Sequence, residues 1–265
     1  MSVAPPPAHR RLLVIGASSG IGRATAVLAA RAGGRVVLVG RRSANLEAAA
    51  AEALDQGGEA IVIAADVRDP AACADVVGAA VKELGGIDCL VYAAARLEPA
   101  FVADADADCW RTALETNVMG AALVTGHALP HLREARGRAV YLSSDSVLRP
   151  RPGVLAYVAS KAALDALVEG LREEEPTVEF SRVLVGPTHG TDIASGWDPV
   201  ARERLKVRWA AGGWDDLRRM TVDECAAEVL HIANSPVHIA DVLVQPRADS
   251  RGEPASGTQR VGAAR

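Results

Sequence analysis

Tyr157 and Lys161 are the residues of this chain whose types and spacing point most directly to chemistry. They stand four residues apart in the run Tyr157-Val158-Ala159-Ser160-Lys161, so in a helix their side chains share one face. An ammonium group at that distance favours the phenolate, and we expect the pKa of the tyrosine to fall below its ordinary value of about 10. Such a tyrosine can exchange a proton with a carbonyl or alcohol oxygen near neutral pH. Ser143-Ser144 and Asn117, further upstream, add polar side chains for the same chemistry.

A glycine-rich run near the start predicts the partner of that chemistry. Gly16-Ala17-Ser18-Ser19-Gly20-Ile21-Gly22 follows a predicted strand at 12–15 and opens a predicted helix at 20–32. Glycines let the backbone turn tightly and approach a pyrophosphate, and a helix N-terminus offers unpaired N–H groups and a positive dipole. The two motifs together therefore predict nicotinamide-dependent carbonyl chemistry.

The end of the second predicted strand favours NADP(H) as the cofactor. An acidic residue there would bind the ribose 2′-hydroxyl of NAD, but this chain has Gly40 followed by Arg41 and Arg42. A guanidinium can grip a 2′-phosphate with two hydrogen bonds. The alternative is that the arginines simply begin a solvated helix. Asp66-Val67, after the third strand, is predicted to bind adenine, or Asp66 caps the helix that follows Pro70.

The elements that must position these residues alternate along the chain. Short apolar runs read as strands at 12–15, 36–39, 60–65, 89–92, 139–142, 180–185 and 241–244. Helical patterns lie at 20–32, 43–56, 70–84, 105–128, 156–174 and 222–234. Continuous apolar strands are typical of a sheet covered on both faces. We predict a single-domain α/β protein with a Rossmann-like, doubly wound parallel sheet of about seven strands and helices on both faces.

Three segments stand outside this alternation. We expect residues 1–10 to form a flexible N-terminal arm and residues 246–265 a flexible tail, with one domain over 11–245. Residues 190–220 are predicted to form a lid over the substrate, and they hold three of the four tryptophans. Within them Ala201, Leu205 and Trp209 share one helical face, which either lines a substrate pocket or packs the lid onto the body.

Composition excludes several other classes of protein. The chain has 265 residues, 49% of them hydrophobic and 23% charged, and a net charge of -4, so we expect no nucleic-acid or acidic-lipid partner. No run resembles a membrane span or a secretory signal. The four cysteines lack metal-site or disulfide spacing, which indicates reduced thiols in a cytoplasmic protein. His127 and His131 are helix neighbours without a third ligand, so we expect no metal.

The motifs, in their order along the chain, resemble those of the short-chain dehydrogenase/reductase family over roughly 11–245. The resemblance implies that Tyr157 is the general acid in reduction and the base in oxidation, and that Lys161 holds the nicotinamide ribose. It implies that Ser144 hydrogen-bonds the substrate oxygen and that Asn117 holds a water in a proton relay. Each residue has a structural alternative, such as a strand-end cap for Ser144 or a surface pair for Tyr157 and Lys161, but the four together favour catalysis.

The chain departs from the family pattern at three places. Ile15 stands where a threonine often precedes the first glycine, and Tyr92-Ala93-Ala94-Ala95 stands where Asn-Asn-Ala-Gly is usual. We expect the missing asparagines to weaken the central sheet, while the backbones of Ala93 and Ala94 still contact the cofactor. Pro187-Thr188 replaces Pro-Gly, and the resemblance makes Thr191 available to the nicotinamide carboxamide or the pyrophosphate.

Together these observations predict an NADP(H)-dependent ketone reductase or alcohol dehydrogenase of small-molecule metabolism. The alternative is a protein that binds NADP(H) as a sensor or interaction partner with little turnover. In the resembled family the helices that carry Asn117 and Tyr157 pack against a second subunit, so we expect a homodimer or homotetramer. The alanine-rich helix at 156–171 suits such close packing.

Overall fold

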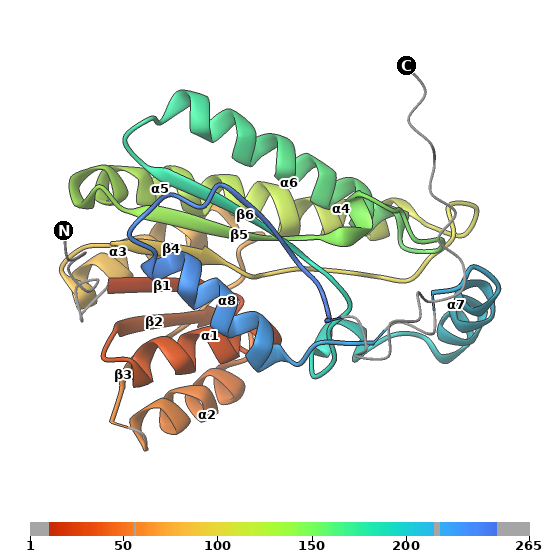
Figure 1. The fold of residues 1–265 in the computed structure, drawn as a ribbon, viewed down its shortest axis with the longest axis horizontal. Coiled ribbons are helices and arrows are strands. Elements are labelled where there is room, and N and C mark those ends of the chain that lie inside the picture. Colours follow the sequence, from red (N-terminus) through yellow and green to blue (C-terminus); the bar gives the residue numbers. More distant parts are fainter. Residues whose placement is uncertain (1–10, 56, 215–217, 248–265) are drawn as a thin grey trace.

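The protein is built on one parallel sheet with helices on both faces, as predicted. The structure, a computed structural model, describes residues 11–55, 57–214 and 218–247. Within these residues the sheet has seven strands in the order β3-β2-β1-β4-β5-β6-β7 (Figure 1). The strands are β1 (Arg11–Ile15), β2 (Arg35–Gly40), β3 (Glu59–Ala64), β4 (Cys89–Tyr92), β5 (Arg138–Ser144), β6 (Glu179–Val185) and β7 (Asp241–Val244). The predicted arm at 1–10 and residues 248–265 of the predicted tail lie outside the described residues.

Two helical layers cover the sheet because its strands are apolar on both sides. Alternate residues of β1 point to opposite faces: Leu13 and Ile15 join one core cluster, and Leu12 and Val14 join the other. The first cluster is closed by α3 (Pro70–Leu84), α5 (Gly120–Ala135) and α6 (Leu155–Glu174). The second is closed by α1 (Gly20–Arg31), α2 (Ser43–Leu54) and α8 (Val222–Asn234).

One long predicted helix is broken into three parts. The pattern at 105–128 folds as α4 (Ala107–Leu114), a π-helical turn (Glu115–Met119) and α5. A π-turn admits one extra residue without ending the helix, and hydrophobic periodicity does not reveal it. The turn matters because it carries Asn117.

The strand order places the site. β1 lies between β2 and β4, so the chain winds away from β1 in both directions and leaves a crevice at the carboxyl ends of these strands. The glycine-rich run leaves the carboxyl end of β1, and Ser143-Ser144 closes β5 at the same edge. The topology therefore gathers the predicted motifs at one edge of the sheet.

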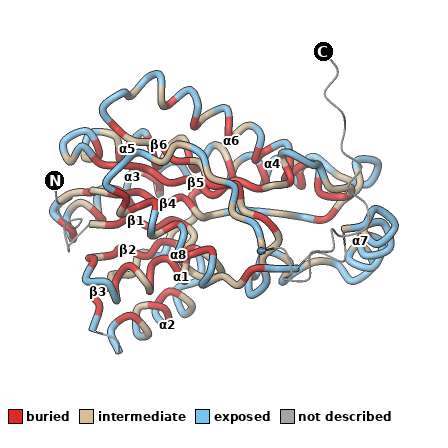
Figure 2. Tube along the Cα trace, in the orientation of Figure 1, coloured by how far each residue is buried: buried red, intermediate tan, exposed pale blue. Residues whose placement is uncertain are grey.

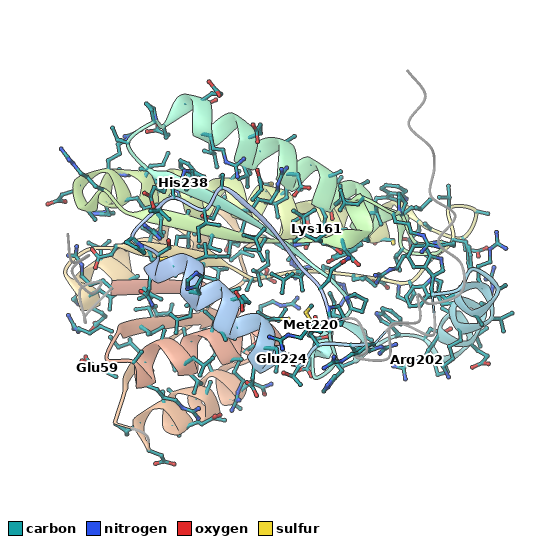
Figure 3. All side chains as sticks on the ribbon, in the orientation of Figure 1. Glu59, Lys161, Arg202, Met220, Glu224 and His238 are labelled. Atoms are coloured by element: carbon teal, nitrogen blue, oxygen red, sulfur yellow. The ribbon has the colours of Figure 1, made fainter. Side chains whose placement is uncertain are left out.

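The lid segment, residues 190–220, stands beyond this edge. It contains α7 (Pro199–Ala211), which Figure 2 shows exposed along most of its length; Leu205 is the helix's buried residue. Both ends of the segment are tied to the end of β6, because Met220 N–H donates to Pro187 O at 2.9 Å and His189 N–H donates to Met220 O at 2.9 Å. Met220 is labelled in Figure 3. The chain therefore leaves and returns to the sheet edge at the same place, next to the end of β6.

Candidate active site

A cavity of about 410 Å³ lies at the carboxyl ends of the central strands. With one exception it is lined by all the residues predicted for cofactor and catalysis: Gly16, Ser18, Ser19, Gly20, Ile21, Gly22, Arg41, Arg42, Asp66, Val67, Ala93, Ala94, Ser144, Tyr157, Lys161, Pro187 and Thr191. The exception is Asn117, which is completely buried beside the cavity. One cavity therefore joins the glycine-rich turn to the tyrosine–lysine helix.

The glycine-rich turn has the shape of a pyrophosphate cradle. Gly16 has a φ of +88°, and a Cβ there would lie 2.5 Å from Ala94 N. A Cβ on Gly22 would lie 2.4 Å from Gly16 O, so neither position accepts a side chain. The first turn of α1 holds no acidic residue, and Gly20, Ile21 and Gly22 at its start line the cavity. The residues present thus fit a dinucleotide, with the phosphates at this helix end.

Arginines surround the end of β2. Arg42 donates from Nη2 to Ser19 Oγ at 2.7 Å and from Nη1 to the lid residue Asp192 at 2.8 Å. Arg41 is more exposed and lies 3.9 Å from Asp66. Arg42 is exposed and directly precedes α2 (Ser43–Leu54), as the solvated-helix alternative expects, and its guanidinium also contacts the glycine-rich turn.

Asp66 forms an ion pair with Arg68 and does not cap a helix. Arg68 donates from Nη2 to Asp66 Oδ2 at 2.6 Å, and this hydrogen bonding lowers the pKa of Asp66 below its ordinary value. The alternative role of Asp66 as a helix cap is wrong, since Asp69 accepts from Ala71 N–H at the start of α3. Asp66 therefore stays ionised at the cavity wall.

Ser144, Tyr157 and Lys161 line the same cavity as the glycine-rich turn. Ser144 Oγ accepts from Ser146 Oγ at 2.8 Å, and the Ser144 side chain also hydrogen-bonds with Tyr157. Lys161, labelled in Figure 3, reaches from α6 to the sheet and donates from Nζ to Leu142 O at 2.7 Å. Its Nζ lies 5.8 Å from the centre of the Tyr157 ring. The lysine thus shares the tyrosine's face of α6, as its spacing predicts.

The expected lowering of the Tyr157 pKa is wrong for this structure. Burial raises the pKa of Tyr157 to about 12, which outweighs the opposing hydrogen bond with Ser144. Burial likewise lowers the pKa of Lys161 to about 8, against the attraction of Asp165. The i, i+4 argument fails because it omits desolvation, which disfavours the charged form of both groups. Tyr157 is accordingly a neutral phenol across the physiological range.

Asn117 ties the loop after β4 to α6. Its Oδ1 accepts from Arg96 N–H at 2.7 Å, and its Nδ2 donates to Arg96 O at 2.9 Å and to Ser160 Oγ at 2.8 Å. Ser160 in turn donates to Tyr157 O at 2.7 Å. The structure therefore connects Asn117 to the tyrosine helix through Ser160, one turn from the reacting groups.

Tyr92 supports the π-turn that carries Asn117, a role that the sequence analysis did not predict. Its hydroxyl donates to Thr116 O at 2.6 Å, directly before Asn117 in the π-turn. A Cβ on Gly120 would lie 2.7 Å from that hydroxyl, so the helix approaches β4 closely. This hydrogen bond links β4 to the π-turn at the position where the missing asparagines predicted a weaker central sheet. The available signal was a tyrosine in an otherwise apolar strand, because a buried phenol needs a partner.

The end of the cavity that holds Tyr157 combines apolar side chains with one ion pair. Arg151 donates from Nη2 to both oxygens of Asp145, at 2.9 and 3.1 Å, and both residues line the cavity. Trp209 lines it too and donates from Nε1 to Pro152 O at 2.9 Å, whereas Leu205 packs in a cluster with Tyr157. The predicted face of α7 thus serves both as pocket wall and as packing. No sequence pattern singled out Asp145 or Arg151.

A doubly wound sheet with a glycine-rich turn at its switch-point cavity is the arrangement of a dinucleotide-binding fold. Comparison with known families agrees: the short-chain dehydrogenase family model matches residues 10–200. The chain belongs to the short-chain dehydrogenase family.

Relatives of known sequence belong to the same family but extend further. The chain is 36% identical over 182 residues to 11-beta-hydroxysteroid dehydrogenase A of Sesamum indicum, covering 68% of this chain and 52% of that protein. It is 29% identical to glycine betaine reductase of Emericella nidulans over 89% of this chain but 18% of that protein. The match therefore spans about half of the first relative and less of the second.

Solved structures share the fold over nearly the whole chain. A putative short-chain alcohol dehydrogenase from Sinorhizobium meliloti superposes with a TM-score of 0.78 at 27% identity, covering 88% of this chain and 94% of that one. An alcohol dehydrogenase from Thermococcus sibiricus, complexed with 5-hydroxy-NADP, superposes with a TM-score of 0.77 at 24% identity, covering 89% and 96%. The architecture is thus that of short-chain dehydrogenases.

Proposed function

We propose that the protein is an NADP(H)-dependent oxidoreductase that interconverts a ketone and a secondary alcohol of small-molecule metabolism. One observation carries the proposal: a single cavity is lined by the pyrophosphate cradle at one end and by Ser144 and Tyr157 at the other. A cofactor that spans the cavity brings its reactive end to the tyrosine. The cofactor supplies the hydride, and the chain supplies binding, orientation and the proton.

The proton chemistry follows from the state of Tyr157. As a neutral phenol it is a proton donor to the carbonyl oxygen in reduction. Ser144 has a hydroxyl hydrogen to donate to the same oxygen as negative charge develops there, an effect worth roughly 3–4 kcal/mol per donor. Lys161 stands one helical turn away; in this proposal its ammonium holds the nicotinamide ribose and favours the phenolate once the proton has left.

The choice of NADP(H) rests on charge at the end of β2. Gly40 stands where a carboxylate would bind the ribose of NAD, and Arg41 and Arg42 line the cavity beside it. The Thermococcus protein of the same fold is complexed with an NADP derivative. Arg41→Asp should weaken NADPH binding at least about tenfold and NADH binding much less, because a charge-assisted bond becomes a repulsion. Equal losses would overturn this assignment.

The substrate is a ketone or alcohol with an apolar body. Leu97, Val154 and Trp209 line the cavity and pack in one cluster with Tyr157, and the charges of Asp145 and Arg151 also act on Tyr157. Relatives named for hydroxysteroid and glycine betaine chemistry support carbonyl and alcohol substrates as a class.

Titration with NADPH and, separately, NADH tests the proposal, with nicotinamide fluorescence as the readout and a carbonyl panel to follow. The expected result is preferential NADPH binding and consumption of NADPH with a ketone. NADH preference would overturn the cofactor and leave the enzyme class. Absence of binding to both would overturn the function. Binding without turnover on any carbonyl or alcohol would favour the sensor or interaction role.

We also propose a homodimer or homotetramer in the cytoplasm. The outward face of α6 exposes Leu155, Ala159, Ala162 and Ala166, small or apolar residues at helical spacing. Leu114 and Met119, on the neighbouring helices, are 42% and 37% exposed. The cytoplasmic location rests on the four cysteines, which are all buried and whose spacing indicates reduced thiols. In the described part of the chain, no helix combines the length and apolarity needed to cross a membrane. Light scattering of the purified protein tests the assembly; a monomer would contradict it.

A further inference from the structure

Arg42 is held between the glycine-rich turn and the lid segment. Nη2 donates to Ser19 Oγ at 2.7 Å and to Ser18 Oγ at 3.2 Å, while Nη1 donates to Asp192 Oδ2 at 2.8 Å. The lid segment begins directly against the turn, because a Cβ on Gly20 would lie 3.5 Å from the side chain of Thr191. Arg42 and Asp192 both line the cavity. The ion pair therefore joins the lid segment to the ribose end of the cofactor site.

At the ribose end of the cavity, the positive charges of the arginines are nearly balanced by the carboxylates that contact them. Asp66 is already bound by Arg68 at 2.6 Å, and Arg41 is only 3.9 Å from the same carboxylate. Asp192 takes the charge of Arg42. Three guanidiniums thus face two carboxylates. A ribose 2′-phosphate carries about -1.5 to -2 charges at pH 7, so it meets less positive charge than the arginines alone would offer.

We propose that Asp192 is a specificity residue of the cofactor site, a lid carboxylate that competes with the 2′-phosphate of NADP(H) for Arg42. It occupies the Nη1 edge that a phosphate oxygen would use, and its own charge repels the phosphate. NAD(H) lacks that phosphate and leaves the pair intact. The chain therefore binds NADP(H) less tightly, and prefers it less strongly over NAD(H), than its arginines allow. This inference rests on the proposed function, which places the cofactor in this cavity.

The structure also separates this role from lid stability. The side chains of Arg42 and Asp192 are 45% and 43% exposed, and such pairs contribute little to folding. Asp192 starts a short helical turn in which its backbone oxygen accepts from Ser195 N–H, a contact that asparagine keeps. Asp198 provides a matched control: it is another lid carboxylate, it lines neither end of the cavity, and it caps α7 by accepting from Ala201 N–H. Asparagine serves equally well as a cap.

The test compares wild type, Asp192→Asn and Asp198→Asn in binding titrations. NADPH and NADH are followed by nicotinamide fluorescence, and adenosine 2′,5′-bisphosphate and adenosine 5′-monophosphate by calorimetry, since these fragments report the ribose end without the nicotinamide. We expect Asp192→Asn to bind NADPH and the bisphosphate about fivefold more tightly, because removal of an exposed ion pair frees Arg42. NADH and the monophosphate should change by less than about twofold. Asp198→Asn should match wild type for all four ligands.

Two results would overturn the inference while the proposed function stands. In the first, wild type binds NADPH and Asp192→Asn binds it no more tightly, which would mean that Asp192 does not compete with the phosphate for Arg42. In the second, Asp198→Asn gains as much as Asp192→Asn, which would reduce the effect to net charge. If wild type binds neither dinucleotide, the proposed function itself fails and the inference falls with it.

Discussion

Replacement of Tyr92 by phenylalanine removes one hydroxyl and tests how the chain holds Asn117 in place. The hydroxyl is completely buried and donates to Thr116 O at 2.6 Å, one residue before Asn117. Burial raises the pKa of Tyr92 far above its ordinary value, so the group remains a donor at any working pH. Loss of one buried hydrogen bond costs about 1–2 kcal/mol in the free energy of unfolding. The ring itself stays packed, since phenylalanine has the same shape.

Tyr141 supplies the matched control. It is equally buried in the next strand, stacks on Tyr92 with ring centres 6.4 Å apart, and has one hydroxyl hydrogen bond, to Thr125 at 2.7 Å. That bond does not touch the π-turn. Both phenylalanine variants should therefore lose similar stability in urea unfolding, whereas only Tyr92→Phe should lower kcat with a carbonyl substrate, at an unchanged Kd for NADPH. Equal kcat values for the two variants would refute the assignment of Tyr92 to the support of Asn117.

Two further predictions concern the glycine-rich turn and the buried lysine. Gly22→Ala should abolish cofactor binding, since its Cβ would lie 2.4 Å from Gly16 O. The control Gly78→Ala, on a helix face with open space, should bind the cofactor normally and gain about 0.5–1 kcal/mol of stability. Normal cofactor binding by Gly22→Ala would contradict the assignment of the glycine-rich turn as a pyrophosphate cradle. Burial lowers the pKa of Lys161 from 10.5 to about 8, so between these values the unfolded chain binds more protons and folding stability rises with pH. The stability of wild type relative to Lys161→Met should therefore increase from pH 8 to 10 in urea titrations, and parallel pH profiles would disprove the shift.

The sequence predicted the architecture well because its signals are local. Each strand covered on both faces appears as a continuous apolar run, and the observed strands end within two residues of the predicted ones. The motifs could also be placed together, because parallel strands present their carboxyl ends at one edge. Asp69 and Pro70 at the start of α3 and the Thr221–Glu224 capping box at the start of α8 explain why those helices begin where they were predicted.

What escaped prediction depends on contacts between distant residues. The hydroxyl of Tyr92 in β4 donates to Thr116 O in the π-turn, and the ion pair of Arg42 with Asp192 joins residues 150 positions apart. The wrong direction for the pKa of Tyr157 has the same origin, since helical spacing reports a neighbouring charge but not the burial of both groups. The π-turn at Glu115–Met119 differs from a regular helix by one residue, too little to disturb the apolar pattern.

The most direct test of the central claim is the turnover of Tyr157→Phe with NADPH and a ketone that wild type reduces. The variant keeps the ring that packs beside Val154 and loses only the proton donor. We predict that it binds NADPH within about twofold of wild type, while turnover falls by at least about 100-fold, the usual contribution of a general acid. Turnover equal to that of wild type would contradict the role of Tyr157 and the mechanism built on it.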